Sequence, residues 1–476
     1  MKNKFTPLPL LALAMSLCTL SLASPSAASA PPRPLDAVSP QADGVEEDKN
    51  HGYRRQYTIH ADHAWLADGT VISPAYITLS NGVIGRISTR APQEQKNLFG
   101  GSTKPKVIKV KGTLAPGLVD AWSGLMPIEV AQDRRPLPQS DMTDNLPVNV
   151  EGADPALSTA IGAQRASGVA ATYMGRADGN LQRGLGVAVG FSAYDLPYES
   201  GLQFLDLSVT GDALGVQAGI RGINDLFQEA IDWRDSLLDF DEKMEKYEES
   251  LKKYQEDLDK FIEEKKKEEA ENGGDSQAEE KNGKDKKEKK RPKRPSRPKA
   301  PIQTSARKLV LAAVDGEYPV RVHAESVAAI RAALALQDEH DLNMMIVGGQ
   351  HAVECRFELA EAGVGVVLDL NRVGNESMGR TFAQQFKMLL DAEVDVALSS
   401  GGRNLGPMLL TYAGELIAQG ADSQAVWTAL TATPARLLGM DSSFGSINRG
   451  RSGSMILFGG SSPFDASGSF QAHKPK

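Results

Sequence analysis

Histidine and cysteine are scarce in this chain of 476 residues, which contains seven histidines and two cysteines. Cys18 lies in an N-terminal apolar stretch, so only Cys355 remains in the part of the chain that is expected to fold. A single thiol excludes an intramolecular disulfide. The few histidines leave little material for a metal centre, because catalytic zinc sites need three protein ligands. After the N-terminal stretch, no apolar run is long enough to cross a bilayer.

The first thirty residues have the order of segments that is typical of a secretory signal peptide. Lys2 and Lys4 precede an apolar stretch from Leu8 to Leu22, and small residues end the segment at Ala30. We expect cleavage after Ala30 and export to the periplasm. Loss of the two lysines takes the formal net charge from −8 to −10. A chain this acidic is not expected to bind nucleic acid.

Strand-like segments stand at both ends of the remaining chain. Residues 31–56 are rich in proline and acidic residues, which predicts a flexible lead-in. Short alternating apolar runs over 57–113 predict strands, and Asn81-Gly82 predicts a hairpin turn between two of them. A similar run, Ser454–Phe458, returns within 441–476. We expect the two chain ends to pair with each other.

Between residues 114 and 440, eight apolar strand-like runs alternate with helical segments. Runs that are apolar throughout suit parallel strands that are covered on both faces. Eight such runs predict a (β/α)8 barrel, whose functional residues belong at the carboxyl ends of the strands. The runs are Leu114–Asp120, Val169–Met174, Val187–Phe191, Phe204–Val209, Tyr318–His323, Met344–Gly348, Val364–Asp369 and Val394–Ser399.

An insertion over residues 223–305 interrupts this alternation. From Ile223 to Phe261 the apolar residues recur at alternating steps of three and four, which predicts a long helix with the seam of a coiled coil. The stripe beyond Phe240 indicates a surface for self-association or for a partner chain, and folding back along the protein's own surface is the alternative. The segment Lys281–Lys299 is rich in lysine and proline and is expected to be a disordered return.

The segment Leu114-Ala-Pro-Gly-Leu-Val-Asp-Ala-Trp-Ser-Gly-Leu125 resembles the first barrel strand of the amidohydrolase superfamily, closest to its imidazolonepropionase-like branch. Ala429–Gly439 and Gly445–Gly450 are also similar to signatures of this family. The resemblance implies a (β/α)8 barrel with a small β-sandwich formed by both chain ends. It also implies hydrolysis of C–N bonds other than peptide bonds, or of peptide-like substrates, with zinc or another divalent metal as the cofactor.

Most of the residues that bind the metal in that family are replaced here. At the end of the first strand, where the resemblance implies two ligand histidines, this chain has Trp122 and Gly124. Gly348 stands at the histidine position of the sixth strand, and Gly401 at the position of the aspartate that binds metal and moves the proton. Only His323, at the fifth strand, is retained. Because neither an indole nor a glycine can replace an imidazole ligand, we expect no bound metal and impaired catalysis.

Several polar residues are candidates to line the barrel mouth. His351 either contributes a substitute imidazole or begins the helix after the sixth strand. The charged residues either bind a polar ligand without metal or are solvated loop residues. The candidates are Asp120, His323, Glu325, His351, Asp369 and Arg403.

Three functions therefore stay open. The first is a working amidohydrolase. The second is a non-catalytic binding or scaffolding subunit that holds an active amidohydrolase, or a second copy of itself, through the helix over 223–261. The third is a periplasmic solute-binding protein with a small-molecule ligand.

Overall fold

The computed structural model describes residues 56–66, 69–93, 95–96, 102–103, 106–125, 155–175, 182–191, 199–209, 211–271, 290–403, 405–460, 464 and 470–473. The predicted signal peptide and lead-in lie outside these residues, apart from Gln56. All described residues belong to one compact unit that starts at residue 54. Among them, no helix combines the length and the apolar character that a membrane span requires.

Two β-sheets form a small sandwich to which both ends of the chain contribute. The first sheet has the order β5 (Val83–Ser88), β4 (Ala75–Ser80), β1 (Gln56–Ala61) and β8 (Val107–Lys109). The second has the order β19 (Phe470–His473), β18 (Met455–Phe458), β9 (Thr113–Pro116), β2 (His63–Trp65) and β3 (Val71–Ile72). Ile77, Leu114 and Met455 meet in the core between the sheets. The expected sandwich of both chain ends is confirmed.

A nearly closed barrel lies between the two parts of the sandwich in the sequence, and its eight strands are neighbours in chain order. It confirms the predicted fold class. The strands are β10 (Leu118–Leu125), β11 (Val169–Met174), β12 (Gln182–Gly190), β13 (Glu199–Val209), β14 (Val320–Ala324), β15 (Met344–Gly348), β16 (Gly365–Asp369) and β17 (Val396–Ser399). A small ribbon of β6 (Gln95–Lys96) and β7 (Ser102–Thr103) lies outside both the sandwich sheets and the barrel sheet.

One barrel strand runs against the others. β12 pairs antiparallel with both β11 and β13, whereas the remaining neighbours in the sheet pair in parallel. The expectation of eight parallel strands alternating with helices was therefore wrong at this position. The physical reason is chain length. Only residues 175–181 and 191–198 connect β12 to its neighbours, and a parallel crossover needs roughly a dozen residues or more.

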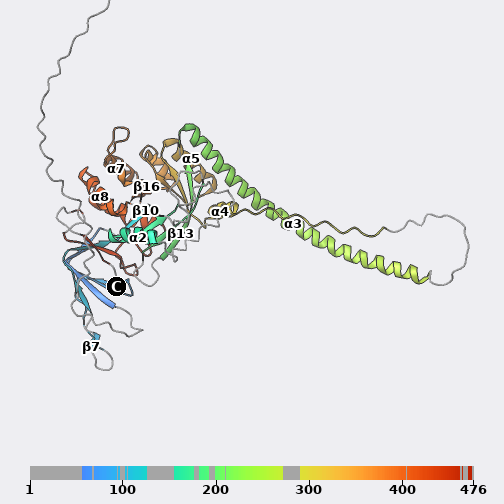
Figure 1. Cartoon of the computed structure of the whole chain (residues 1–476), viewed down its shortest axis with the longest axis horizontal. Coiled ribbons are helices and arrows are strands. Elements are labelled where there is room, and N and C mark those ends of the chain that lie inside the picture. Colours follow the sequence, from blue (N-terminus) through green and yellow to red (C-terminus); the bar gives the residue numbers. More distant parts are fainter. Residues whose placement is uncertain are drawn as a thin grey trace, which may run out of the picture. The chain divides into compact units, whose positions relative to one another are not determined.

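Helices cover the outside of the barrel (Figure 1). The barrel has two separate apolar cores. The outer core lies between strands and helices, and alternate strand residues such as Val322, Ile346 and Leu398 point into it. The inner core fills the barrel with Val347, Val367 and other inward residues. The α-helices on the barrel are α2 (Pro155–Ala166), α4 (Ser305–Val314), α5 (Val327–His340), α6 (Arg356–Glu361), α7 (Phe382–Asp391), α8 (Leu409–Ala418), α9 (Ser423–Leu430) and α10 (Ala432–Leu437).

The insertion begins with a single helix, α3 (Ala213–Glu271), of 59 residues. At 1.5 Å per residue it is about 88 Å long, and it starts ten residues before the predicted Ile223. Its first part is anchored to the barrel helices by buried residues that include Phe227 and Trp233, and Phe227 stacks on His340 of α5. Beyond Trp233 its described side chains are half-buried or exposed. We call the part of α3 from Phe240 onward, together with residues 290–304, the arm.

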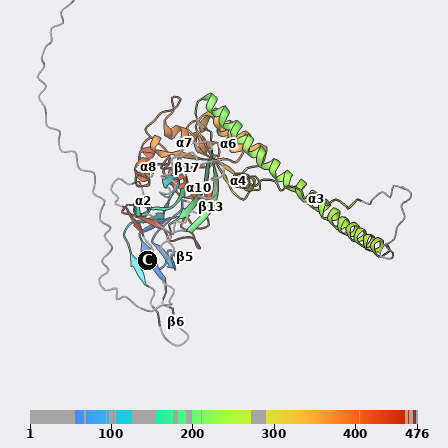
Figure 2. The same ribbon diagram turned by 45° about the vertical axis from the view of Figure 1, so that its right-hand side comes forward.

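Residues 290–304 run back beside α3 in both views (Figures 1 and 2). Their burial repeats every third residue, because Pro292, Pro295, Pro298 and Pro301 are half-buried and the residues between them are exposed. Three residues per turn is the period of a polyproline II helix. On α3, the predicted seam shows the matching pattern, and its half-buried residues are Phe240, Met244, Tyr247, Leu251, Tyr254, Leu258 and Phe261.

The arm therefore pairs a proline face with the seam of α3. This differs from the expected disordered return over Lys281–Lys299, of which residues 290–299 have a defined path. The physical reason is that a polyproline II backbone needs no hydrogen-bond partners within the protein, because its N–H and C=O groups stay solvated, so the strand can cover an apolar stripe without joining a sheet. The seam is thus partly covered by the protein's own chain.

The proline face should stabilise the arm helix. Replacing Pro295 and Pro298 by serine should lower the temperature at which helical circular dichroism is lost, because the seam would face water. The unfolding transition that tryptophan fluorescence reports should stay at the same temperature, since the four tryptophans lie outside the arm. The control variant Arg294→Gln/Arg297→Gln changes exposed residues of the same strand. An equal shift in that control would contradict the pairing.

Candidate site at the barrel mouth

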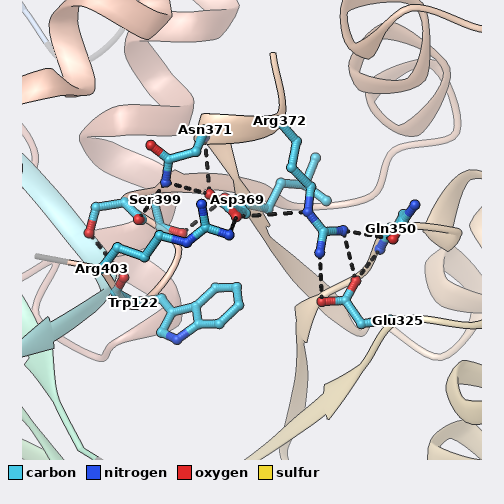
Figure 3. Close-up of polar contacts among 10 residues, drawn as sticks. Trp122, Glu325, Gln350, Asp369, Asn371, Arg372, Ser399 and Arg403 are labelled. Atoms are coloured by element: carbon cyan, nitrogen blue, oxygen red, sulfur yellow. Dashed lines mark hydrogen bonds and ion pairs between the residues drawn. The ribbon is translucent and has the colours of Figure 1, made fainter. Parts of the chain in front are cut away.

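Five of the six predicted site residues lie on barrel strands or on the loops at the carboxyl end of the barrel, which we call the mouth, and Figure 3 labels Glu325, Asp369 and Arg403 among them. Asp369 ends β16, Glu325 follows β14, and Arg403 lies in the loop after β17. Asp120 and His323 come from β10 and β14. Parallel strands end on the same side of a barrel, which explains why residues far apart in the sequence converge here.

Asp120 joins the first barrel strand to the last. Its Oδ2 accepts a hydrogen bond from Ser400 Oγ at 2.6 Å, and its Oδ1 accepts from the backbone N–H groups of Ser400 at 3.1 Å and Trp122 at 3.2 Å. Burial raises the pKa of Asp120 above its ordinary value of 3.8, and the hydrogen bonds from Ser400 and Trp122 offset part of this rise. These contacts are internal, so Asp120 closes the barrel and does not face a ligand.

A network of two carboxylates and two guanidinium groups spans the mouth (Figure 3). Arg372 donates to Glu325 at 3.1 Å and lies 3.8 Å from Asp369. Arg403 lies 3.7 Å from the same Asp369 oxygen. Asp369 is only 2 % exposed, so its charge needs these partners. Gln350 completes the network by accepting from Arg372 at 3.0 Å.

His323 and Trp122 form an aromatic pair beside this network. Their ring centroids are 5.3 Å apart and the ring planes meet at 72°, an edge-on arrangement. His323 is only 4 % exposed. The indole N–H of Trp122 is buried and finds no acceptor among the described residues. The indole of Trp122 thus packs on His323, the one histidine that remains at a position where the family resemblance implies a metal ligand.

Other groups fill the space at the three glycines that stand where the family resemblance implies ligands. A Cβ at Gly401 would lie 2.1 Å from Asp369 Oδ1, and one at Gly348 would lie 2.5 Å from Glu325 Oε1. At Gly124 the neighbour is backbone, because the Cβ would lie 2.1 Å from the carbonyl oxygen of Gly402. All three glycines have positive φ, between 67° and 97°, which strains any other residue. A ligand side chain does not fit at these positions without rearrangement.

Within the part of the chain that the structure describes, the mouth does not offer the ligands of the metal that the family resemblance implies. A zinc-type site needs at least three convergent donors. Among the described residues, no group of three or more His, Cys, Asp or Glu side chains is arranged to hold a metal ion. The two carboxylates at the mouth face arginines, and the imidazole faces an indole.

The sixth predicted residue, His351, does not join the network. It stands at the N-cap position of the 3-10 helix η3 (Ala352–Cys355) without a side-chain capping hydrogen bond, which agrees with the alternative that it begins the helix after the sixth strand. Its Nδ1 lies 4.0 Å from Glu354 Oε2, and the other oxygen of that carboxylate, Oε1, accepts a hydrogen bond from Arg380.

Sequence reasoning missed a buried ion pair inside the barrel. Arg321 is fully buried on β14, and its Nε donates to Asp206 Oδ1 at 3.1 Å. Tyr173 donates to the other Asp206 oxygen at 2.6 Å, and its ring lies 3.4 Å from the Arg321 guanidinium carbon. Residues two apart on a strand share a face, so Arg321 lies one layer below His323. An arginine inside an apolar strand was the available signal.

Arg372 and Ser400 were also missed. Both lie beside predicted residues, Arg372 three positions after Asp369 and Ser400 directly after β17. Their roles depend on partners from other strands, so the sequence around them carries no signal for those contacts.

An amidohydrolase from Thermotoga maritima has a similar structure, with a TM-score of 0.60 and 17% identity over 87% of this chain and 96% of that one. An adenosine deaminase from Xanthomonas campestris with bound zinc matches with a TM-score of 0.41 and 17% identity over 84% of each chain. No protein-family model and no curated protein matches the sequence. The first similarity shows that the chain has the amidohydrolase fold.

Titration of Asp120 should be visible in the pH dependence of stability. Because its folded-state pKa is raised, the folded state binds this proton more tightly than the unfolded state does. The contribution of Asp120 to the free energy of unfolding is fully present below pH 3.8, the ordinary pKa of the group. This contribution is lost as pH rises through the higher pKa that Asp120 has in the folded state. The melting temperature of the wild type relative to Asp120→Asn should therefore fall over this window. A constant difference between the two proteins would contradict the shift.

The charge network should make Arg372 important for stability. Arg372→Met should lower the free energy of unfolding by about 1–2 kcal/mol, because the buried Asp369 and the half-buried Glu325 lose their shared partner. The control is Arg331→Met. Arg331 and its partner Glu358 are 59% and 42% exposed, so this loss should be below ~1 kcal/mol. Urea unfolding followed by tryptophan fluorescence measures both, and equal losses would argue against the network.

Proposed function

We propose that this protein is an exported member of the amidohydrolase superfamily, similar to its imidazolonepropionase-like branch, that binds a ligand or partner and does not hydrolyse C–N bonds. One observation carries the proposal. The space at Gly124, Gly348 and Gly401 is filled by a carbonyl and two carboxylates of the protein itself. Export to the periplasm rests on the signal-peptide pattern of the first thirty residues.

Metal-dependent hydrolysis needs a bound water and a group that takes its proton. Asp369 and Glu325 are the acidic candidates near the mouth, and both are held in ion pairs with arginine. His323 packs on Trp122, and among the described residues no group of three or more His, Cys, Asp or Glu side chains that could hold a metal includes it.

A cavity next to the network favours a small-molecule ligand as the bound species. It has a volume of about 260 Å³ and lies between the ends of β15 and β16 and helix α7. Arg372 and Asp369 form a polar wall, and Leu368, Phe382 and Leu389 contribute apolar surface. This combination suits a small solute with one charged or polar end and one apolar end.

Pairing with an active amidohydrolase through the arm is the other non-catalytic function. The half-burial of the seam beside residues 290–304 leaves less apolar surface for a partner than the sequence alone predicted. The solute-binding function therefore has the better support.

Metal content and turnover test the proposal. The mature chain, equilibrated with zinc, should retain no stoichiometric metal. It should hydrolyse dipeptides, N-acyl amino acids and cyclic ureides no faster than buffer does. Trp122→His/Gly124→His should gain neither metal nor activity, because a side chain at residue 124 meets the Gly402 carbonyl.

Two further measurements sharpen this test. Zinc bound beside His323, with activity that His323→Ala abolishes, would overturn the non-catalytic function. For the solute-binding function, thermal stabilisation by a compound from the same panel should disappear in Arg372→Met and persist in Arg331→Met. Stabilisation that survives Arg372→Met would place the solute elsewhere.

A further inference from the structure

The strand of the arm is a tripeptide repeat, Lys290-Arg-Pro-Lys-Arg-Pro-Ser-Arg-Pro-Lys-Ala-Pro301. In a polyproline II helix each position of such a repeat forms its own face. The prolines form the half-buried face, and we infer that this face lies toward α3 because the strand and the helix run side by side (Figures 1 and 2). A second face carries an arginine in each of its first three turns. The third face carries lysine, with a serine at one position. The arginines are Arg291, Arg294 and Arg297, and the lysines are Lys290, Lys293 and Lys299.

These six cations are exposed, and none of them makes an ion pair or hydrogen bond within the described residues. The neighbouring helix is acidic, but several of its acids are already paired with lysines one turn away. Examples are Asp239 with Lys243 and Glu242 with Lys246, both at 2.5 Å. The positive charge of the strand is therefore available to another molecule.

The geometry of the strand determines what kind of surface it suits. At about 3.1 Å per residue, arginines three positions apart lie about 9 Å from each other along the strand. Because the helix covers one of three faces, the arginine and lysine faces together form a broad basic strip that points away from it. A flat anionic surface can contact both faces at once, whereas a single linear polymer follows one of them.

An apolar side chain adjoins this strip. Ile302 directly follows the repeat and is 79% exposed. Contact with a soluble polyanion leaves an exposed isoleucine in water and adds little to binding. Insertion of the same side chain between lipid headgroups and acyl chains buries its apolar surface and strengthens binding. The acidic balance of the whole chain also disfavours nucleic acid.

We propose that the strand Lys290–Pro301 docks the arm onto an anionic phospholipid surface. Four to eight basic residues in a cluster are typical of such electrostatic binding. Guanidinium groups pair with phosphate through two parallel hydrogen bonds, which favours the arginine face as the main contact. The acids of α3 lie behind the strand, and salt screens their repulsion over roughly 8–10 Å.

Sedimentation with lipid vesicles tests this proposal on the full mature chain. Binding should occur with vesicles that contain phosphatidylglycerol, should be absent with phosphatidylcholine alone, and should weaken as salt rises. Arg291→Gln/Arg294→Gln/Arg297→Gln should reduce partitioning about a hundredfold, since each basic residue near an anionic surface contributes roughly a factor of five. Ile302→Ser should reduce it by a smaller factor.

The matched control removes three exposed lysines from α3 in Lys252→Gln/Lys253→Gln/Lys260→Gln, which changes the net charge equally. Its partitioning should stay within about threefold of the wild type, because these lysines lie outside the strand. An equal loss in the control, or binding to both vesicle types alike, would overturn the proposal. So would release by inorganic phosphate beyond that by chloride at equal ionic strength, or binding to polyphosphate or DNA without binding to vesicles.

Discussion

The first and last barrel strands, β10 and β17, are held together by a few hydrogen bonds. No ladder of described residues joins these two strands. Instead, Gly402 donates its N–H to the Trp122 carbonyl at 2.8 Å, and Asp120 accepts from Ser400. The same approach brings the Gly402 carbonyl against the α-carbon of Gly124. Closure of the barrel and the lack of room for a ligand at residue 124 therefore have one structural origin.

The two arginines at the mouth supply positive charge to carboxylates that are otherwise costly to bury. Asp369 is almost fully buried and lies near both Arg372 and Arg403, and Glu325 shares Arg372. The positive charge that balances these carboxylates comes from arginine side chains of the chain itself and not from an ion taken up from solution. Arg403 is 61% exposed, so it is the member of the network that a ligand can reach most easily.

The sequence was informative where local pattern determines structure. Uninterrupted apolar runs located the eight barrel strands, and strand ends located Asp369 and His323 near the mouth. It was uninformative where the outcome depends on distant partners. Ser400 acts through Asp120, which is 280 positions away, and Arg372 acts through Glu325, which is 47 positions away. The direction of β12 was accessible in principle from its short connections, but apolar character alone does not distinguish parallel from antiparallel pairing.

The arm combines two segments that depend on each other. A helix with an apolar stripe facing water is poorly stabilised, because most helical stability in proteins comes from packing. A strand rich in lysine, arginine and proline has no apolar core of its own and is expected to be disordered alone. The three-residue period of the prolines and the three-four spacing of the seam place apolar groups along one line on each partner. Once the prolines face the helix, the tripeptide repeat leaves the cations no orientation except outward.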